Sequence, residues 1–206
     1  MLKLYFAPAT CSLASHIALE EAGAPYEAEK VDFKAGGQRA PDYLRLNPKG
    51  RVPALVTDRG VLTETPAILA YIGQSFPDSA VGIPKDAFDF ARIQAFNAYL
   101  CSTVHVAHAH KRRASRWADD AAAQEAMAAK VTANMGDCFE LIENTMIAGP
   151  YVMGETYSIA DPYLFTISGW LEGDGVDIAR FPKVLAHRDR MAERPAVKAA
   201  LSAAAG

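Results

Sequence analysis

Cys11 is the first residue whose type and position indicate chemistry. It follows an apolar run, Leu2–Phe6, and a loop, and it stands directly before an amphipathic stretch that begins at Ser12. The unpaired N–H groups and positive end of that helix favour a thiolate, so we expect a lowered pKa. Such a sulfur acts as a nucleophile or stabilises another bound thiolate; the alternative is a small core cysteine. Because Leu13 and Ala14 follow, no C-x-x-C pair exists, and a second thiol has to come from outside.

Hydroxyl groups surround this position. Tyr5, Thr10 and Ser12 could each hydrogen-bond a substrate sulfur. For Ser12 we favour the structural alternative, in which its hydroxyl caps the N-terminus of the helix.

Val52 and Pro53 form the second signal. The proline opens a predicted strand, and a cis bond before it would turn the backbone N–H and C=O of Val52 outward. That pair could then bond an extended peptide in the manner of a strand. The alternative is an ordinary trans proline at a sheet edge, which is far commoner.

Glu64, Thr65 and Pro66 form the third signal, at the start of a predicted helix. Thr65 suits the N-cap and Pro66 the first helical position, so plain capping is one interpretation. The functional interpretation is that the helix end and its hydroxyl bind a carboxylate, while an uncommitted Glu64 pairs with an ammonium group. The α-amino acid end of a ligand carries both charges.

The first third of the chain alternates short strands and helices. We expect strands at 2–6, 26–32, 54–57 and 61–62 and helices at 12–22, 39–46 and 66–74, with a hairpin turn at 58–60. This βαβαββα order is typical of a thioredoxin-like α/β domain. Residues 76–86 carry three prolines and read as a linker.

The remainder is rich in alanine and helical in pattern. Helices are expected at about 86–113, 120–147, 158–171, 182–193 and 195–203. Ser158 and Asp161 have the spacing of a capping box, which we interpret as structural.

Composition narrows the class of protein. The chain has 206 residues, half of them apolar, and 21 basic against 24 acidic side chains give a net charge of −3. Such a chain can bury a sizeable core, and it has no run of charge that would track nucleic acid and no apolar stretch that would span a membrane. Three scattered cysteines do not form a disulfide framework, and the N-terminus does not resemble a signal peptide, so we expect a cytoplasmic protein.

Four sequence blocks together resemble the glutathione transferase family, in particular its bacterial beta class. They are KLYFAPATCSLASHIALEEAG, NPKGRVPAL, LTETPAILAYI and YVMGETYSIADPYLF. The resemblance covers nearly the whole chain, and beta-class members carry a cysteine at the place of Cys11. It implies the two-domain fold of that family, with a thioredoxin-like domain over 1–78 and an all-helical domain over 86–206. It also implies a homodimer that acts in detoxification.

The resemblance also implies roles for individual residues. Glutathione would be the co-substrate, with Val52 holding its cysteinyl backbone and Glu64 and Thr65 its γ-glutamyl end. The residues implied for glutathione are Cys11, Lys34, Arg51, Val52, Pro53, Glu64 and Thr65. The helical domain would supply His105, which faces the sulfur, and the electrophile pocket would comprise Ala9, Thr10, Arg112, Arg113 and Trp117.

Three positions depart from the family pattern. Val106 replaces a lysine, Thr65 replaces a serine, and the basic segment after the second strand is reduced to Lys34 followed by Ala35, Gly36 and Gly37. The residues that hold the glycine carboxylate of glutathione therefore stay open.

The histidines and cations near position 110 allow other interpretations. His105, His108 and His110 do not share one helix face and have no accompanying carboxylate, so we expect no metal. The basic residues Lys111, Arg112, Arg113 and Arg116 form either a solvated helix face, which we favour, or an attractor for an anionic second substrate.

The sequence thus predicts a glutathione transferase that activates the glutathione thiol for conjugation to small electrophiles, for thiol–disulfide exchange through Cys11, or for both. His105 would assist, and Ser12 and Tyr5 would be reserve ligands of the sulfur. Two alternatives are a non-catalytic binding protein with the same fold and a glutaredoxin-like reductase that depends on glutathione.

Overall fold

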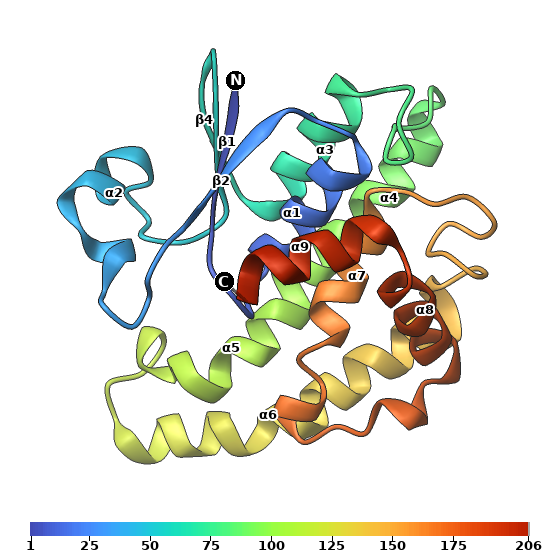
Figure 1. The fold of residues 1–206 in the computed structure, drawn as a ribbon. Helices are drawn as coiled ribbons and strands as arrows, with labels where there is room; N and C mark the ends of the chain where they lie inside the picture. Colours follow the sequence, from blue (N-terminus) through green and yellow to red (C-terminus); the bar gives the residue numbers. More distant parts are fainter. Residues whose placement is uncertain (206) are drawn as a thin grey trace.

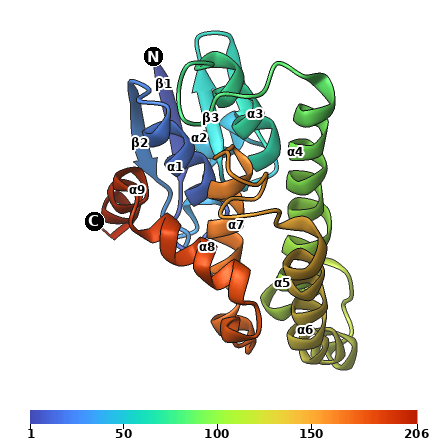
Figure 2. The ribbon, with the colours of Figure 1, turned by 90° about the vertical axis from the view of Figure 1, so that its right-hand side faces the viewer.

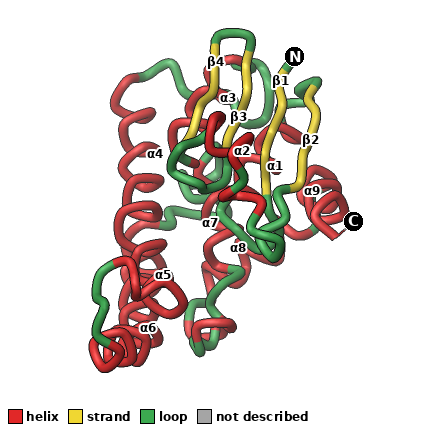
Figure 3. Tube along the Cα trace, turned by 90° about the vertical axis from the view of Figure 1, so that its left-hand side faces the viewer, coloured by secondary structure: helices red, strands yellow, loops and turns green. Residues whose placement is uncertain are grey.

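A four-stranded mixed sheet forms the centre of the N-terminal region. In the computed structural model, which describes residues 1–205, the strands are β1 (Leu2–Phe6), β2 (Tyr26–Lys30), β3 (Ala54–Thr57) and β4 (Gly60–Thr63). Their order is β2-β1-β3-β4, with β1 parallel to β2 and both other pairs antiparallel (Figures 1 and 3). The expected βαβαββα order is confirmed.

Helices cover both faces of this sheet. Helices α1 (Ser12–Glu21) and α3 (Thr65–Ser75) lie on one face, and α2 (Pro41–Leu46) lies on the other (Figure 1). Side chains alternate along β1 accordingly, because successive residues of a strand point to opposite faces. Leu4 and Phe6 join the main core beneath α1, whereas Tyr5 packs against Tyr43 of α2.

Long helices make up the rest of the chain. Helix α4 (Ala87–Tyr99) continues through a π-helical turn into α5 (His105–Arg113), which confirms one predicted helical stretch over this region. It packs along α6 (Ala121–Leu141), followed by α7 (Ala160–Ser168), α8 (Pro182–Ala192) and α9 (Pro195–Ala205) (Figure 2).

The two regions share one core. Helix α1 packs against α7 and α9 as well as α3, so buried residues of the sheet and of the helices form a continuous cluster. This contact holds the loop before α1 against the α4–α5 helix. The division into domains at 1–78 and 86–206 stays a prediction, although α3 ends at Ser75 and α4 begins at Ala87.

Both predicted hydroxyl caps are wrong by one residue. Ser12 and Thr65 are the first helical residues, and the N-cap positions belong to Cys11 and Glu64, neither of which caps with its side chain. The hydroxyl of Ser12 turns back instead and accepts the N–H of Ala7 at 3.1 Å. It therefore fastens the loop before α1.

The predicted capping box is confirmed at the start of α7. The Ser158 N–H donates to Asp161 Oδ2 at 2.7 Å, and the N–H of Val152 donates to Oδ1 at 2.8 Å. His187 Nε2 lies 3.0 Å from the same Oδ1, and Asp161 has no exposed surface. The carboxylate thus joins three segments of the helical region.

Element ends differ slightly from expectation. Strand β2 stops at Lys30, and the predicted helix at 39–46 divides into a short 3₁₀ turn and α2. Among the described residues, no helix has the length and apolar character needed to cross a membrane.

Candidate functional site

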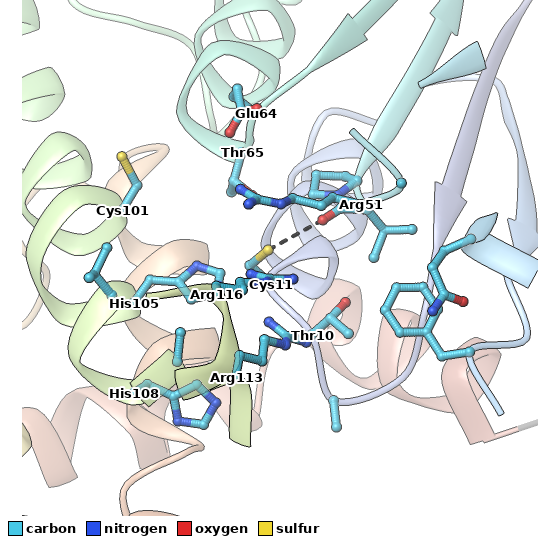
Figure 4. Close-up of a pocket in the computed structure, with 18 of the residues that line it drawn as sticks. Thr10, Cys11, Arg51, Glu64, Thr65, Cys101, His105, His108, Arg113 and Arg116 are labelled. Atoms are coloured by element: carbon cyan, nitrogen blue, oxygen red, sulfur yellow. Dashed lines mark hydrogen bonds between the residues drawn. The ribbon is translucent and has the colours of Figure 1, made fainter. Parts of the chain in front are cut away.

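A cleft of about 360 Å³ lies where the loops of the sheet face α5. Its N-terminal wall includes Cys11, Val52 and Glu64, and its helical wall includes His105 and Trp117. Figure 4 shows Cys11 in the middle of this space, with His105 on the opposite helix. The structure therefore brings together residues from the three local signals of the sequence and from α5.

Cys11 is half-buried and donates a hydrogen bond from its Sγ to the carbonyl oxygen of Val52 at 3.5 Å. Burial raises the pKa of the Cys11 thiol, and the nearby Thr65 hydroxyl and Arg113 only oppose that shift. The expected lowering of the pKa is wrong, because desolvation outweighs the helix end and the hydrogen-bond partner is an acceptor. Cys11 is a neutral thiol at pH 7 and can donate its S–H.

The Val52–Pro53 bond is cis, as the functional interpretation required. The carbonyl before it is fixed from two directions, because the Tyr43 hydroxyl and the Asn47 amide both donate to the Arg51 carbonyl at 2.7 Å. These bonds hold the loop so that the Val52 carbonyl faces Cys11.

Glu64 lies at the start of α3 with a left-handed φ of 73°. It is not the uncommitted carboxylate of the sequence interpretation, because its Oε1 pairs with Lys49 Nζ. Lys49 Nζ also donates to the Thr63 hydroxyl at 2.7 Å. The side chain of Glu64 is 60% exposed, so this ion pair contributes little stability and can give way to a ligand.

His105 projects into the cleft from the first turn of α5 (Figure 4). Burial, followed by the charge of His108 and of nearby arginines, lowers the pKa of His105 to about 4. The imidazole is therefore neutral near pH 7. Its ring lies edge-on against Trp170 at 4.9 Å, and His108 stacks on the same indole at 4.4 Å.

A buried carboxylate supports this aromatic group. Asp174 Oδ2 lies 2.7 Å from His108 Nδ1, which orients the His108 ring against Trp170. His105 is held in turn by the other side of this arrangement. The histidines thus serve orientation and hydrogen bonding from the helical wall.

The basic run at the end of α5 divides into two groups. Arg113 and Arg116 line the cleft, so the favoured interpretation as a solvated face is wrong for these two. Arg112 is exposed and does not line the cleft, and Lys111 reaches the carbonyl oxygen of Gly173 instead.

Most residues predicted for the site line the cleft. They are Ala9, Thr10, Cys11, Arg51, Val52, Pro53, Glu64, Thr65, His105, Arg113 and Trp117. Four others lie elsewhere. Ser12 is buried against Ala7, Tyr5 packs on Tyr43, and Lys34 and Arg112 are exposed on the surface.

The structure adds residues that sequence patterns did not single out. Cys101 lines the same cleft from the π-helical turn, so a second thiol is present without a C-x-x-C motif. Arg39 and Trp170 also line it. Arg39 lies six residues beyond the region that the sequence marked as basic only by Lys34, and no local pattern distinguishes it from an ordinary surface cation.

Comparison with known proteins agrees with this geometry. Residues 1–74 match the family model "Glutathione S-transferase, N-terminal domain", and residues 108–203 match "Glutathione S-transferase, C-terminal domain". The chain is 32% identical to Glutathione S-transferase GstA of Escherichia coli O157:H7, over 98% of each chain.

Solved structures show the same similarity. A glutathione transferase homologue from Sulfitobacter with bound glutathione is 46% identical, with a TM-score of 0.95 over 98% of each chain. A sphingomonad glutathione S-transferase complexed with glutathione is 34% identical, with a TM-score of 0.86 over 98% of each chain.

Proposed function

The chain belongs to the glutathione S-transferase family and is a glutathione-dependent transferase, and we propose that glutathione lies across the N-terminal wall of the cleft with its sulfur beside Cys11. The observation that carries this proposal is the convergence of Cys11, Val52, Glu64 and Thr65 on one cleft. These residues offer a thiol, a peptide acceptor, a carboxylate and a helix start at the places where a γ-glutamyl-cysteinyl unit needs them.

The γ-glutamyl end would bind first by charge. Its ammonium group displaces Lys49 from the exposed Glu64, and its carboxylate meets the N-terminus of α3 beside Thr65. The cysteinyl unit then pairs with the backbone of Val52, which places its sulfur near Cys11 Sγ. Arg39 or Arg51 would hold the glycine carboxylate, since Lys34 is outside the cleft.

Cys11 would act as a hydrogen-bond donor to the bound thiolate. Its raised pKa keeps the proton on Cys11, so its S–H can turn from the Val52 carbonyl to the glutathione sulfur. Neutral His105 supplies a second donor from the helical wall, and Arg113 adds positive charge. The activated sulfur then attacks an electrophile: the S–C bond forms as the bond to the leaving group breaks.

Thiol–disulfide exchange is a second candidate activity, favoured by Cys101. A glutathione mixed disulfide in this cleft would meet two thiols, those of Cys11 and Cys101. Attack by one of them releases reduced glutathione and forms a new disulfide with the protein.

The test combines binding with two kinds of turnover. We expect retention on immobilised glutathione and turnover of a chromogenic aryl halide, with a large loss of turnover in Cys11→Ala and a smaller loss in His105→Ala. Full activity in both variants would contradict these roles. Retention without turnover of the aryl halide or of a mixed disulfide would favour the non-catalytic binding protein, and reduction without conjugation would favour the glutaredoxin-like reductase.

We further propose that the protein is a cytoplasmic homodimer. Phe88 of α4 is 73% exposed and Val61 of β4 is 37% exposed, which suits a contact surface for a second copy. Light scattering is expected to give about twice the 22.2 kDa mass of the chain. A monomer at all concentrations would contradict the dimer.

A further inference from the structure

Four arginines face the cleft, two from each wall. Arg39 and Arg51 come from the N-terminal wall, and Arg113 and Arg116 come from the end of α5 and the turn after it. Figure 4 shows Arg51, Arg113 and Arg116 gathered around Cys11 from both sides. Within residues 1–205, none of the four forms an ion pair with a carboxylate.

The cleft has little negative charge to balance them. Glu64 is the one carboxylate among its lining residues, and Lys49 already pairs with it. The arginines repel one another: after burial, the charges of Arg113, Arg51 and Arg39 lower the pKa of Arg116. Like charges held together without counter-ions favour binding of an anion, because the anion relieves the repulsion.

Glutathione does not use all of this positive charge. Its γ-glutamyl carboxylate is assigned to the start of α3, and its remaining carboxylate needs one cationic site, for which the N-terminal wall offers Arg39 and Arg51. Arg113 and Arg116 are left on the helical wall, where the second substrate has to approach the sulfur.

The wall next to these two arginines is aromatic. Trp117 lies one residue after Arg116 and is 46% exposed, and Trp170 lines the deeper side of the cleft. Flat indole surfaces bind planar, apolar groups, and guanidinium groups bind carboxylates through paired hydrogen bonds.

We propose that Arg113 and Arg116 form a subsite for the anionic group of the second substrate, which is a planar electrophile that carries a carboxylate. This inference rests on the proposed glutathione chemistry of the same cleft. Arg116 is the specificity-determining residue, because Arg113 also acts on Cys11 through its charge.

The test uses two aryl chlorides that differ in one charge: 4-chloro-3,5-dinitrobenzoate and its methyl ester. In both reactions the glutathione sulfur bonds to the ring carbon, chloride leaves with the electron pair of the C–Cl bond, and the thiol proton goes to solvent. Each kcat/KM is divided by the rate constant of the uncatalysed reaction with glutathione, which removes the difference in intrinsic reactivity.

The wild-type protein is expected to favour the carboxylate over the ester by about 10-fold or more, the size of a charge-assisted hydrogen bond. Arg116→Gln should abolish most of that preference, and Arg116→Lys should restore part of it. Added salt should reduce the preference, because it screens charge at a solvent-open cleft. Arg112→Gln is the matched control, since Arg112 is a neighbouring cation outside the cleft, and it should keep the wild-type ratio.

Three results would overturn the subsite. They are equal use of the two substrates by the wild-type protein, an equal loss for both substrates in Arg116→Gln, and a loss of glutathione affinity in that variant that accounts for the whole effect. In the last case Arg116 holds glutathione instead. If the wild-type protein binds no glutathione and turns over neither substrate, the proposed function fails as well, and calorimetry with glutathione separates that outcome from the others.

Discussion

The protein contains two polar clusters that solve opposite problems, one around Asp161 and one in the cleft. Both oxygens of Asp161 accept hydrogen bonds, the carboxylate is fully buried, and its partners come from three segments. In the cleft, Arg113 and Arg116 have no carboxylate partner among the described residues, and Cys11 has only a long bond to a carbonyl. The first cluster is complete without a ligand, and the second is not.

This difference separates stability from function. A buried polar network with its partners satisfied fixes one arrangement of the chain, and its loss leaves buried groups unpaired. Repelling cations and an idle thiol contribute little to folding and gain partners only when a ligand binds. Substitutions in the two clusters should therefore affect different measurements.

The largest effect is expected for Asp161→Ala. Removing this carboxylate leaves two backbone N–H groups and His187 without their partner, so the free energy of unfolding should fall by about 3–5 kcal/mol. Urea unfolding followed by circular dichroism measures this change. Where the variant stays folded, its affinity for glutathione should match the wild type; a loss below about 1 kcal/mol would contradict the assigned role.

Glu64→Gln should show the reverse behaviour. It removes the charge assigned to the ammonium group of glutathione, so Kd should rise about 10-fold or more, while stability changes little because the carboxylate is exposed. Calorimetric titration gives Kd. Asp58→Asn, at the exposed hairpin turn, is the control and should leave Kd unaltered.

The pH dependence tests His105. Its pKa is lowered to about 4, so it stays neutral from pH 8 down to about pH 5 and should add no inflection to kcat/KM in that range. His105→Gln keeps a neutral hydrogen-bonding group and should retain more activity than His105→Ala, by about 5-fold. An inflection near the ordinary histidine pKa of about 6.5 that disappears in His105→Gln would contradict this account.

The same shift has a consequence for stability. An unfolded chain protonates His105 near its ordinary pKa, whereas the folded chain does so only near 4. The unfolded state therefore binds more protons in between, and the wild type should lose stability relative to His105→Gln as pH falls from 7 to 5. Equal pH dependence in the two proteins would show that the pKa is not lowered.

The smallest effect is expected for Arg116→Gln on folding. Removing one of several mutually repelling cations should leave the free energy of unfolding unchanged or raise it by about 0.5 kcal/mol. Urea unfolding at low salt is the measurement, with Arg112→Gln as the comparison. A loss above about 1 kcal/mol would place Arg116 in a structural role like that of Asp161.

The N-terminal wall could be predicted because its residues follow one another in local motifs. Cys11 precedes α1, Val52 precedes a cis proline, and Glu64 precedes α3, so strand, turn and helix signals place all three. The two caps were misplaced by one residue, since the hydroxyl of Ser12 bonds the preceding loop and Glu64 takes a left-handed backbone. Local patterns do not reveal either choice.

The helical wall could be predicted only in part. His105, Arg113 and Trp117 followed from the family resemblance, but Arg116 and Cys101 reach the cleft only through the packing of α4 and α5 against the sheet. The direction of the Cys11 pKa failed for the same reason, because desolvation depends on the tertiary structure. The carboxylate of Asp161 was predictable because the capping box is a local motif.

The central claim is that glutathione completes the cleft with its sulfur at Cys11. A crystal structure of the protein grown with millimolar glutathione tests it most directly. We expect the sulfur of the tripeptide within hydrogen-bonding reach of Cys11 Sγ, its ammonium group on Glu64 in place of Lys49, and its cysteinyl backbone paired with Val52. A cleft without the tripeptide, or a sulfur that points away from Cys11, would contradict the account.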